Sequence, residues 1–334
     1  MVYDLPLTLI LIVVLALIFD YINGFHDTAN AIALSIQTKA LTPLSAVILA
    51  AIFNFLGALA GTTVAETIGS KLVDPKILSS EGLCVVLVSA IIWNLITWWK
   101  GLPSSSSHAL IGGILGLALI SSPWKDILWL GFFKVILFLI ITPMLGLTIA
   151  KTFMKIMYRV FSNPNTHKVN ASFRRLQVVS ASFMAFSHGS NDAQKSMAII
   201  TMALVSHGSI ETFYVPLWVT VACALAMALG TLAGGWRIIK TVGSEITKIT
   251  PINGFTADIT GSLIIYGSSL LGLPISTTHV VSSAIMGVGW AKHFTAVNWK
   301  KGKEIVGAWF LTIPCVCLFC VLSFLLLRAI NILI

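Results

Sequence analysis

Ten long apolar runs occupy most of this 334-residue chain, and they restrict what it can fold into. Hydrophobic residues make up 57% of the sequence and charged residues 10%, which leaves too little polar surface for a water-soluble domain. The runs lack alternating polarity and are too long for the strands of a membrane barrel. A segment surrounded by lipid satisfies its backbone hydrogen bonds only as a helix. The sequence therefore predicts an all-α polytopic membrane protein.

The expected spans form two sets of five with a basic segment between them. They lie at about residues 5–36, 43–65, 82–99, 104–121, 127–150, 176–204, 213–236, 255–272, 275–291 and 304–330. The segment 151–175 contains six Lys and Arg residues and no acidic residue. We therefore divide the chain into a first transmembrane repeat at 1–150, a basic linker at 151–175 and a second repeat at 176–334.

Lys and Arg are distributed unevenly over the connecting loops. If each span crosses once, the loops on the side of the linker hold 15 of the 21 Lys and Arg residues. Cytoplasmic loops carry such an excess, so we expect the linker to be cytoplasmic and both termini to be external. An odd number of crossings in each half inverts the second half relative to the first. Since topology accounts for the net charge of +9, we expect the lipid bilayer and not nucleic acid as a partner.

Two polar motifs interrupt the apolar runs, at residues 23–30 and 187–195. When they are superposed, three pairs coincide: Gly24 with Gly189, Asp27 with Asp192, and Asn30 with Lys195. Burying such groups in hydrocarbon costs several kcal/mol unless each finds a partner, so ionisable residues inside spans usually mark a transport pathway. We expect broken or re-entrant helices at these motifs. The alternative is that each carboxylate pairs with a polar neighbour and only locks two helices together.

A second repeated pattern, Gly-Leu-Pro-x-Ser-Ser/Thr-Ser/Thr-His, occurs at residues 101–108 and 272–279. Pro suits the first turn of a helix and hydroxyl residues cap its start, where free N–H groups and the helix dipole attract an anion. Two such starts that face one another would surround a tetrahedral oxyanion. The predicted substrate ligands from these stretches are Ser104, Ser105, Ser106, Ser107, His108, Ser276, Thr277, Thr278 and His279. The alternative is that the hydroxyls bond to carbonyl groups of their own helix.

A third repeated pattern relates residues 57–61 to 230–234 and residues 67–69 to 241–243. The order of the three repeated patterns is the same in both halves. A duplication inserted in opposite orientation accounts for all of them. The fold expected is thus two inverted five-helix repeats.

The charged and amide side chains of the polar motifs divide into two roles. Asp27 and Asp192 repel an anion, so they are better suited to hold a cation or a proton beside it. The amides of Asn30, Asn191 and Gln194 suit either a hard cation or an oxyanion. We assign Asp27, Asn30, Asp192 and His26 to the coupling ion, and Asn191, Gln194 and Lys195 to the substrate. Lys195 either neutralises Asp192 or meets the charge of the substrate, and both interpretations stay open.

Four histidines, at positions 26, 108, 188 and 279, raise the possibility of a metal site. No two of them have the i, i+4 spacing of a helical zinc site, and we expect no resident metal. An intramembrane hydrolase would need a nucleophile paired with a base. Ser107 and His108 are adjacent on a helix, so their side chains point about 100° apart. We therefore expect no enzymatic activity and no cofactor.

These motifs resemble those of the inorganic phosphate transporter family, PiT, whose members carry two copies of a Gly-x-Asn-Asp-x-Ala-Asn/Gln signature. Residues 24–30 and 189–195 stand in its place, and the resemblance covers essentially the whole chain. It implies inverted repeats, a phosphate site between paired half-helices, symport with sodium or protons and, in some members, uptake of phosphate with a divalent metal. It also implies a homodimer. The short linker indicates a prokaryotic form in the cytoplasmic membrane.

His26 occupies a position where many members of the family have Asn. An imidazole is a poor substitute for an oxygen ligand of sodium, which favours proton coupling. The opposing interpretation is that Asp27, Asn30, Asp192 and backbone carbonyls hold sodium while His26 caps a broken helix.

The sequence thus predicts a secondary active transporter that imports inorganic phosphate. The alternatives are a sulfate or other oxyanion permease of the same fold and a phosphate channel. Phosphate can donate a proton to a carboxylate whereas sulfate cannot, so Asp27 and Asp192 favour phosphate.

Overall fold

A computed structural model describes residues 7–74, 78–121, 123, 127–161 and 167–333. This part of the chain is built of helices, with two isolated β-bridges at its loops. The α-helices are α1 (Leu7–Gln37), α2 (Pro43–Ala58), α3 (Thr63–Lys71), α4 (Ser80–Trp99), α5 (Ser106–Ser121), α6 (Trp129–Val160), α7 (His167–Ser206), α8 (Leu217–Ala233), α9 (Trp236–Lys240), α10 (Pro251–Leu270), α11 (Thr277–Lys292) and α12 (Trp299–Leu333). Each of the ten predicted spans coincides with one of these helices, and α3 and α9 are short additions.

Not every helix can cross a membrane by itself. By length and composition, α1, α4, α6 and α12 are long and apolar enough. Two bent pairs have the length and composition of a broken span or a re-entrant loop: α2 with α3 at 61°, and α8 with the segment Trp236–Glu245 at 63°. α5 and α11 have 16 residues each, fewer than the roughly 20 that a bilayer core requires. The all-helical membrane fold with broken helices is therefore confirmed, although the spans are not ten single crossings.

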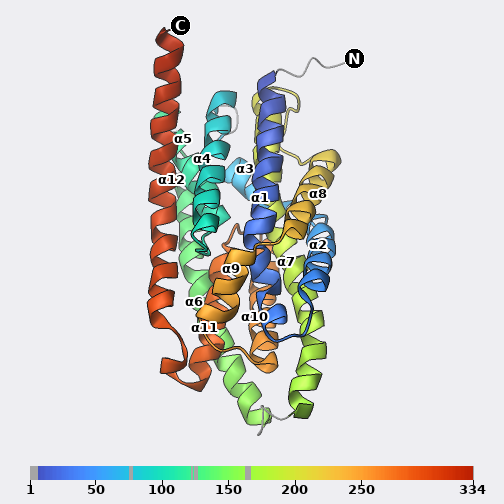
Figure 1. Cartoon of the computed structure of the whole chain (residues 1–334). Coiled ribbons are helices and arrows are strands. Elements are labelled where there is room, and N and C mark those ends of the chain that lie inside the picture. The colour runs from blue at the N-terminus through green and yellow to red at the C-terminus, as the bar shows by residue number, and fades with distance from the viewer. Residues whose placement is uncertain (1–6, 75–77, 122, 124–126, 162–166, 334) are drawn as a thin grey trace.

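The two halves of the chain run in opposite directions. In Figure 1, α1 starts at the end of the molecule where the chain termini lie and α7 starts at the opposite end; α6 and α12 are likewise opposed. The halves also exchange equivalent contacts, since α1 packs against α8 as α7 packs against α2, and α5 packs against α12 as α11 packs against α6. This is the arrangement that inverted repeats produce.

Glycines allow helices of opposite halves to pack closely. A Cβ atom added at Gly24 would lie 2.5 Å from a backbone oxygen of α8, and one at Gly230 would lie 2.0 Å from a backbone oxygen of α1. Gly57 and Gly189 make the matching approach between α2 and α7, at 2.0 and 2.1 Å. Small residues permit such contact between helices in lipid. Close contacts between the halves therefore occur at glycines of the polar motifs and of the third repeated pattern.

The predicted basic linker is taken up largely by helix ends. α6 continues to Val160 and α7 begins at His167. The linker residues 162–166 lie outside the described residues. In Figure 1, α6 ends and α7 begins on the side opposite the termini, which is where the expected topology places the linker.

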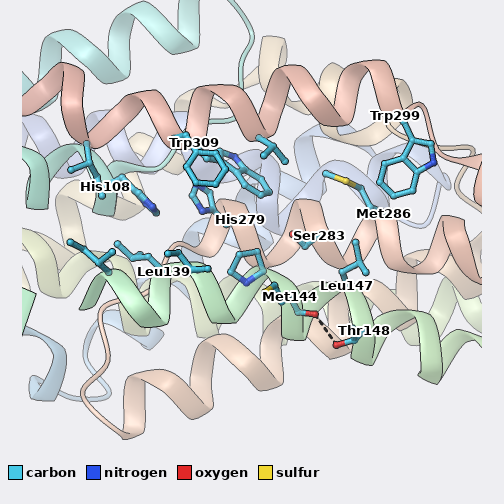
Figure 2. Close-up of a pocket in the computed structure, with 16 residues that line it drawn as sticks. His108, Leu139, Met144, Leu147, Thr148, His279, Ser283, Met286, Trp299 and Trp309 are labelled. Atoms are coloured by element: carbon cyan, nitrogen blue, oxygen red, sulfur yellow. Dashed lines mark hydrogen bonds between the residues drawn. The ribbon is translucent and has the colours of Figure 1, made fainter. Parts of the chain in front are cut away.

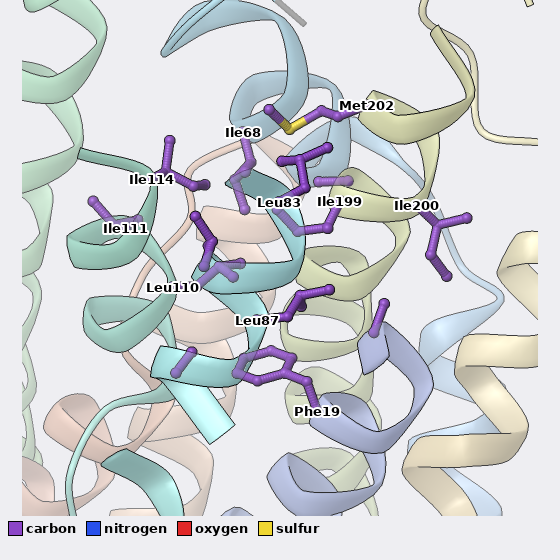
Figure 3. Packing of buried hydrophobic residues seen from close by; sticks show 14 of the residues in the cluster. Phe19, Ile68, Leu83, Leu87, Leu110, Ile111, Ile114, Ile199, Ile200 and Met202 are labelled. Carbon is purple, nitrogen blue, oxygen red and sulfur yellow. The ribbon is translucent and has the colours of Figure 1, made fainter. Parts of the chain in front are cut away.

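Buried apolar side chains form two clusters, one toward each end of the molecule. Figure 3 shows part of the first, where Phe19 of α1 meets Leu87 of α4 and Ile68 of α3 packs near Met202 of α7. The second cluster contains residues 29, 31–34 of α1 and 184–185 of α7. Between the clusters lie residues 20–28 of α1 and 187–192 of α7, which we call the polar layer.

Candidate functional site

The polar layer lies within unbroken helices. The α-helical conformation continues through residues 23–30 of α1 and 187–195 of α7, so the expected breaks at the two Asp motifs are absent from these described segments. The breaks occur instead between α2 and α3 and between α8 and α9. Side chains of other helices satisfy the polar groups of the motifs, so the backbone need not open.

Two helical hairpins bring the hydroxyl residues to this layer. In the first hairpin, Gly101 lies two residues after the end of α4, and its φ of 65° lets the N–H of Leu102 bond to the carbonyl of Thr97 at 2.9 Å. The second hairpin ends α10 in the same way at Gly272, with a φ of 67°. α5 and α11 then begin and run back. The repeated Gly-Leu-Pro pattern is thus a helix stop followed by a helix start.

The starts of α5 and α11 meet the two buried carboxylates. Ser106 Oγ donates to Asp27 at 3.3 Å, and Thr277 Oγ1 makes the equivalent bond to Asp192 at 3.3 Å. Thr278 Oγ1 also donates to Asp27, at 3.1 Å, and accepts from the amide of Asn30 at 2.9 Å. Each carboxylate therefore binds hydroxyls from a helix start, and Asp27 binds both starts.

The two carboxylates have different basic neighbours. His26 Nδ1 lies 2.7 Å from Asp27 Oδ1, and its Nε2 lies 3.1 Å from Thr97 Oγ1, so both ring nitrogens are engaged. Lys195 Nζ lies 2.7 Å from Asp192 Oδ2 and donates to Ser106 at 3.0 Å. All of these side chains are at most 3% exposed.

A third basic group, His188, lies between the carboxylates. Ligand atoms of Asp27, His188 and Asp192 all lie within 4.8 Å of one another, which is compatible with a shared cation or proton. Asn54 of α2 orients the ring, because its Oδ1 lies 2.9 Å from His188 Nδ1. We predicted no specific role for His188 from the sequence, because its partner four residues later is a carboxylate, Asp192, and not another histidine.

Several acceptor atoms in and beside the layer have no protein partner. Among the described residues, these buried oxygens are both carboxylate oxygens of Asp20, Asn23 Oδ1, Asn30 Oδ1, Asn191 Oδ1 and Asp192 Oδ1. A buried acceptor without a hydrogen bond is unfavourable by about 1–3 kcal/mol. The arrangement thus has oxygens free for a cation and, at the two helix starts, donors for an anion.

Comparison with known proteins identifies the family of this chain. Residues 23–320 match the phosphate transporter family. The chain belongs to the phosphate transporter family. It is 49% identical to a probable low-affinity inorganic phosphate transporter of Bacillus subtilis (strain 168), over 91% of this chain and 92% of that one. It is 44% identical to a similarly named protein of Rhizobium meliloti (strain 1021), over 94% of each.

A solved structure titled "The sodium-dependent phosphate transporter" has the same fold. It covers 97% of this chain and 99% of its own, with a TM-score of 0.86 and 25% sequence identity. The family resemblance found in the sequence is therefore confirmed.

Several predicted substrate ligands lie near Asp27 and Asp192 but bond to other groups. Ser104 donates to Thr97, and Ser107 donates to the carbonyl of Ile275 at 2.7 Å. Ser105 and Ser276 cap α5 and α11 by accepting from the N–H groups three residues later, at 3.1 and 3.2 Å. These hydroxyls shape the helix starts, while Ser106, Thr277 and Thr278 reach the carboxylates.

Two predicted amide ligands are engaged elsewhere. Gln194 Oε1 accepts from the N–H groups of Val64 and Ala65 at 2.7 and 3.1 Å, so it caps the short helix α3. Asn191 donates to Ser269 at 2.9 Å near the end of α10. Its equivalent, His26, is tied to the end of α4 through Thr97. Both residues therefore attach an Asp-bearing helix to a hairpin.

The predicted ligands His108 and His279 contact each other, with ring centroids 4.3 Å apart, and His279 stacks on Trp309 at 3.9 Å. Figure 2 shows these rings lining a cavity of about 460 Å³ between α6 and α12. Aliphatic side chains such as Leu139 and Met144 form most of its wall. Phosphate would lose its hydration there without gaining donors, so this cavity does not suit it.

Proposed function

We propose that this protein is a secondary transporter that imports inorganic phosphate by symport with a cation. One observation carries the proposal: two helix starts bearing hydroxyls converge on two buried carboxylates. The helix starts offer N–H and hydroxyl donors to an oxyanion, while the carboxylates bind the positive charge that accompanies it. The names of the Bacillus and Rhizobium relatives agree with phosphate as the substrate.

Phosphate fits this site better than sulfate does. An anion at the helix starts would lie beside Asp27 and Asp192 and be repelled by them. A protonated phosphate can donate a hydrogen bond to a carboxylate, whereas sulfate has no proton at neutral pH. Sulfate should therefore compete only weakly for uptake of labelled phosphate.

We further propose the proton as the coupling ion, held at His26 and Asp27. Their 2.7 Å contact joins a proton-binding ring to a carboxylate inside the site. Both ring nitrogens have partners, so His26 offers no free atom to a metal cation. Sodium is the second candidate, because the solved relative is titled as sodium-dependent.

The test is initial uptake of labelled phosphate into proteoliposomes at fixed membrane potential, with pH and sodium gradients imposed separately. The proposal expects uptake to follow the pH gradient and to continue without sodium. Uptake that requires sodium and does not change with the pH gradient would show that sodium is the coupling ion. Downhill flux without accumulation under either gradient would indicate a channel.

A further inference from the structure

The described part of the chain contains one buried Lys or Arg side chain, that of Lys195, which is 1% exposed. Burying an ammonium group in a membrane protein is costly unless it is paired. Its partners are Asp192, three residues earlier on α7, and Ser106 at the start of α5. The carboxylate and the lysine are therefore held together by their own helix.

The equivalent position in the first half has a neutral side chain. There Asn30 donates through Nδ2 to Thr278 at 2.9 Å, and its buried Oδ1 has no hydrogen-bond partner among the described residues. Lys195 likewise donates to a hydroxyl at a helix start. Each residue thus donates to a hydroxyl at the helix start of the other half, although Ser106 and Thr278 are neighbouring and not equivalent positions of the repeat. The first half presents an open amide oxygen where the second half presents a positive charge.

We propose that the Lys195 ammonium is a built-in cation that fills the cation site of the second half. It binds a carboxylate oxygen and a hydroxyl oxygen, the ligand types that an alkali cation would use. Because the ammonium is covalently attached, it does not leave with the substrate. The second half therefore exchanges no cation during transport. Asp27, with the buried Asp20 further back on α1, is left for the coupling ion.

The contacts favour this role over direct binding of phosphate. Two of the three ammonium donors are used within the site, one by Asp192 and one by Ser106. Ser106 in turn donates to Asp27, so the lysine also stabilises the link between the two carboxylates. A lysine released toward phosphate would take away the ammonium 2.7 Å from Asp192. This buried carboxylate would be left with longer contacts, at 3.3–3.5 Å, to Thr277, Asn23 and His188. Removing the near partner of a buried charge is unfavourable.

The inference rests on the proposed function, because it takes the carboxylates to be the cation sites, but its test needs no transport. The purified protein in detergent is melted in sodium chloride and in choline chloride at equal ionic strength, without phosphate. Asp27→Asn removes the carboxylate of the first motif and leaves Asp20 on α1. A sodium effect in that background therefore reports the second half only where Asp192→Asn abolishes it. Ligands that bind the folded state raise Tm.

The Asp27→Asn protein should show the same Tm in both salts. Adding Lys195→Asn, which places the residue of the first half in the second, should raise Tm by a few degrees in sodium. Adding Lys195→Arg instead keeps the charge and should give no sodium effect. Adding Asp192→Asn to the Asp27→Asn, Lys195→Asn protein should abolish the shift.

A sodium shift in the Asp27→Asn protein that is abolished by adding Asp192→Asn would overturn the proposal. Equal Tm values in the two salts for the folded protein with Lys195→Asn would also overturn it. Lys195→Gln in the same background is the second variant if the Asn variant does not fold, with the same expectations. Isothermal titration with inorganic phosphate gives a separate readout. A loss of phosphate binding on Lys195→Asn without a sodium shift would make Lys195 a phosphate ligand and also overturn the proposal. Failed phosphate uptake by the native protein would contradict the proposed function and leave these results standing.

Discussion

Two of the four buried Asp side chains among the described residues, Asp27 and Asp192, occupy equivalent positions but differ in their surroundings. Asp27 contacts an imidazole and hydroxyls from both helix starts. Asp192 contacts the ammonium of Lys195 and a hydroxyl. The sequence predicted that both would lie in one site. It left open whether Lys195 pairs with Asp192 or meets the substrate, and the structure shows the pair. It did not predict that His26 joins Asp27 to Thr97, because only packing selects among the polar groups that could lie there.

Asp27→Asn should reduce phosphate accumulation at least roughly tenfold, since the amide keeps the shape but cannot hold the coupling charge. Proteoliposome uptake under the driving gradient measures it, with size-exclusion profiles as the control for folding. Accumulation equal to that of the native protein would contradict the assignment of Asp27.

Asp192→Asn should also lower stability, by about 3–5 kcal/mol, because it leaves the buried ammonium of Lys195 unpaired. Adding Lys195→Met should recover part of that loss, whereas Asp27→Asn leaves no such unpaired ammonium. Thermal unfolding in detergent compares the variants. A loss that Lys195→Met does not relieve would show that the pair is not the cause.

Thr277→Val and Thr278→Val should raise the half-saturation concentration for phosphate. Each change keeps the side-chain volume and removes a donor, and a bond to a charged group contributes about 1.5–3 kcal/mol, which is roughly tenfold or more in affinity. Thr256→Val is the matched control, since that buried hydroxyl bonds to the carbonyl of Ile252. Unchanged half-saturation in both site variants would place the anion elsewhere.

At the scale of the helices, apolar runs were enough to locate the elements, but not their breaks. The polar motifs were expected to interrupt α1 and α7, yet both helices continue because partners on neighbouring helices satisfy their side chains. The breaks follow Ala58 and Ala233. The signal for them was present in the third repeated pattern, residues 57–61 and 230–234, whose first glycines, Gly57 and Gly230, also make close helix contacts.

Gly189→Ala should destabilise the protein by about 1–3 kcal/mol, because the added methyl group would lie 2.1 Å from the carbonyl oxygen of Asn54 and α2 would have to move. Gly307→Ala in α12 is the control, with nothing within 4 Å of the added carbon. Its Tm should stay the same or rise slightly. Equal effects of the two substitutions in thermal unfolding would exclude close packing as the cause.

For the molecule as a whole, the repeated motifs predicted the two inverted halves, and Figure 1 shows equivalent helices running in opposite directions. The contacts between halves could not be predicted from the chain alone. Asp27 and Thr278, for example, are 251 residues apart, and many alternative pairings satisfy the same local patterns.

The distribution of Lys and Arg predicts that both termini face outward. A C-terminal fusion to alkaline phosphatase should therefore be active, and a C-terminal green fluorescent protein should not fluoresce. A second pair of fusions ending near residue 165 should give the opposite result. Fluorescence from the full-length fusion would reverse the orientation.

The separation of Asp27 from its partner also bears on how the protein is made. At about 5–20 residues per second, a ribosome needs roughly 13–50 s to synthesise the 251 residues between Asp27 and Thr278. During that interval α1 has left the ribosome while α11 does not yet exist. Until α11 is made, the nascent first half can satisfy its acidic group only through its own residues, such as His26 and Ser106, or through water and lipid headgroups.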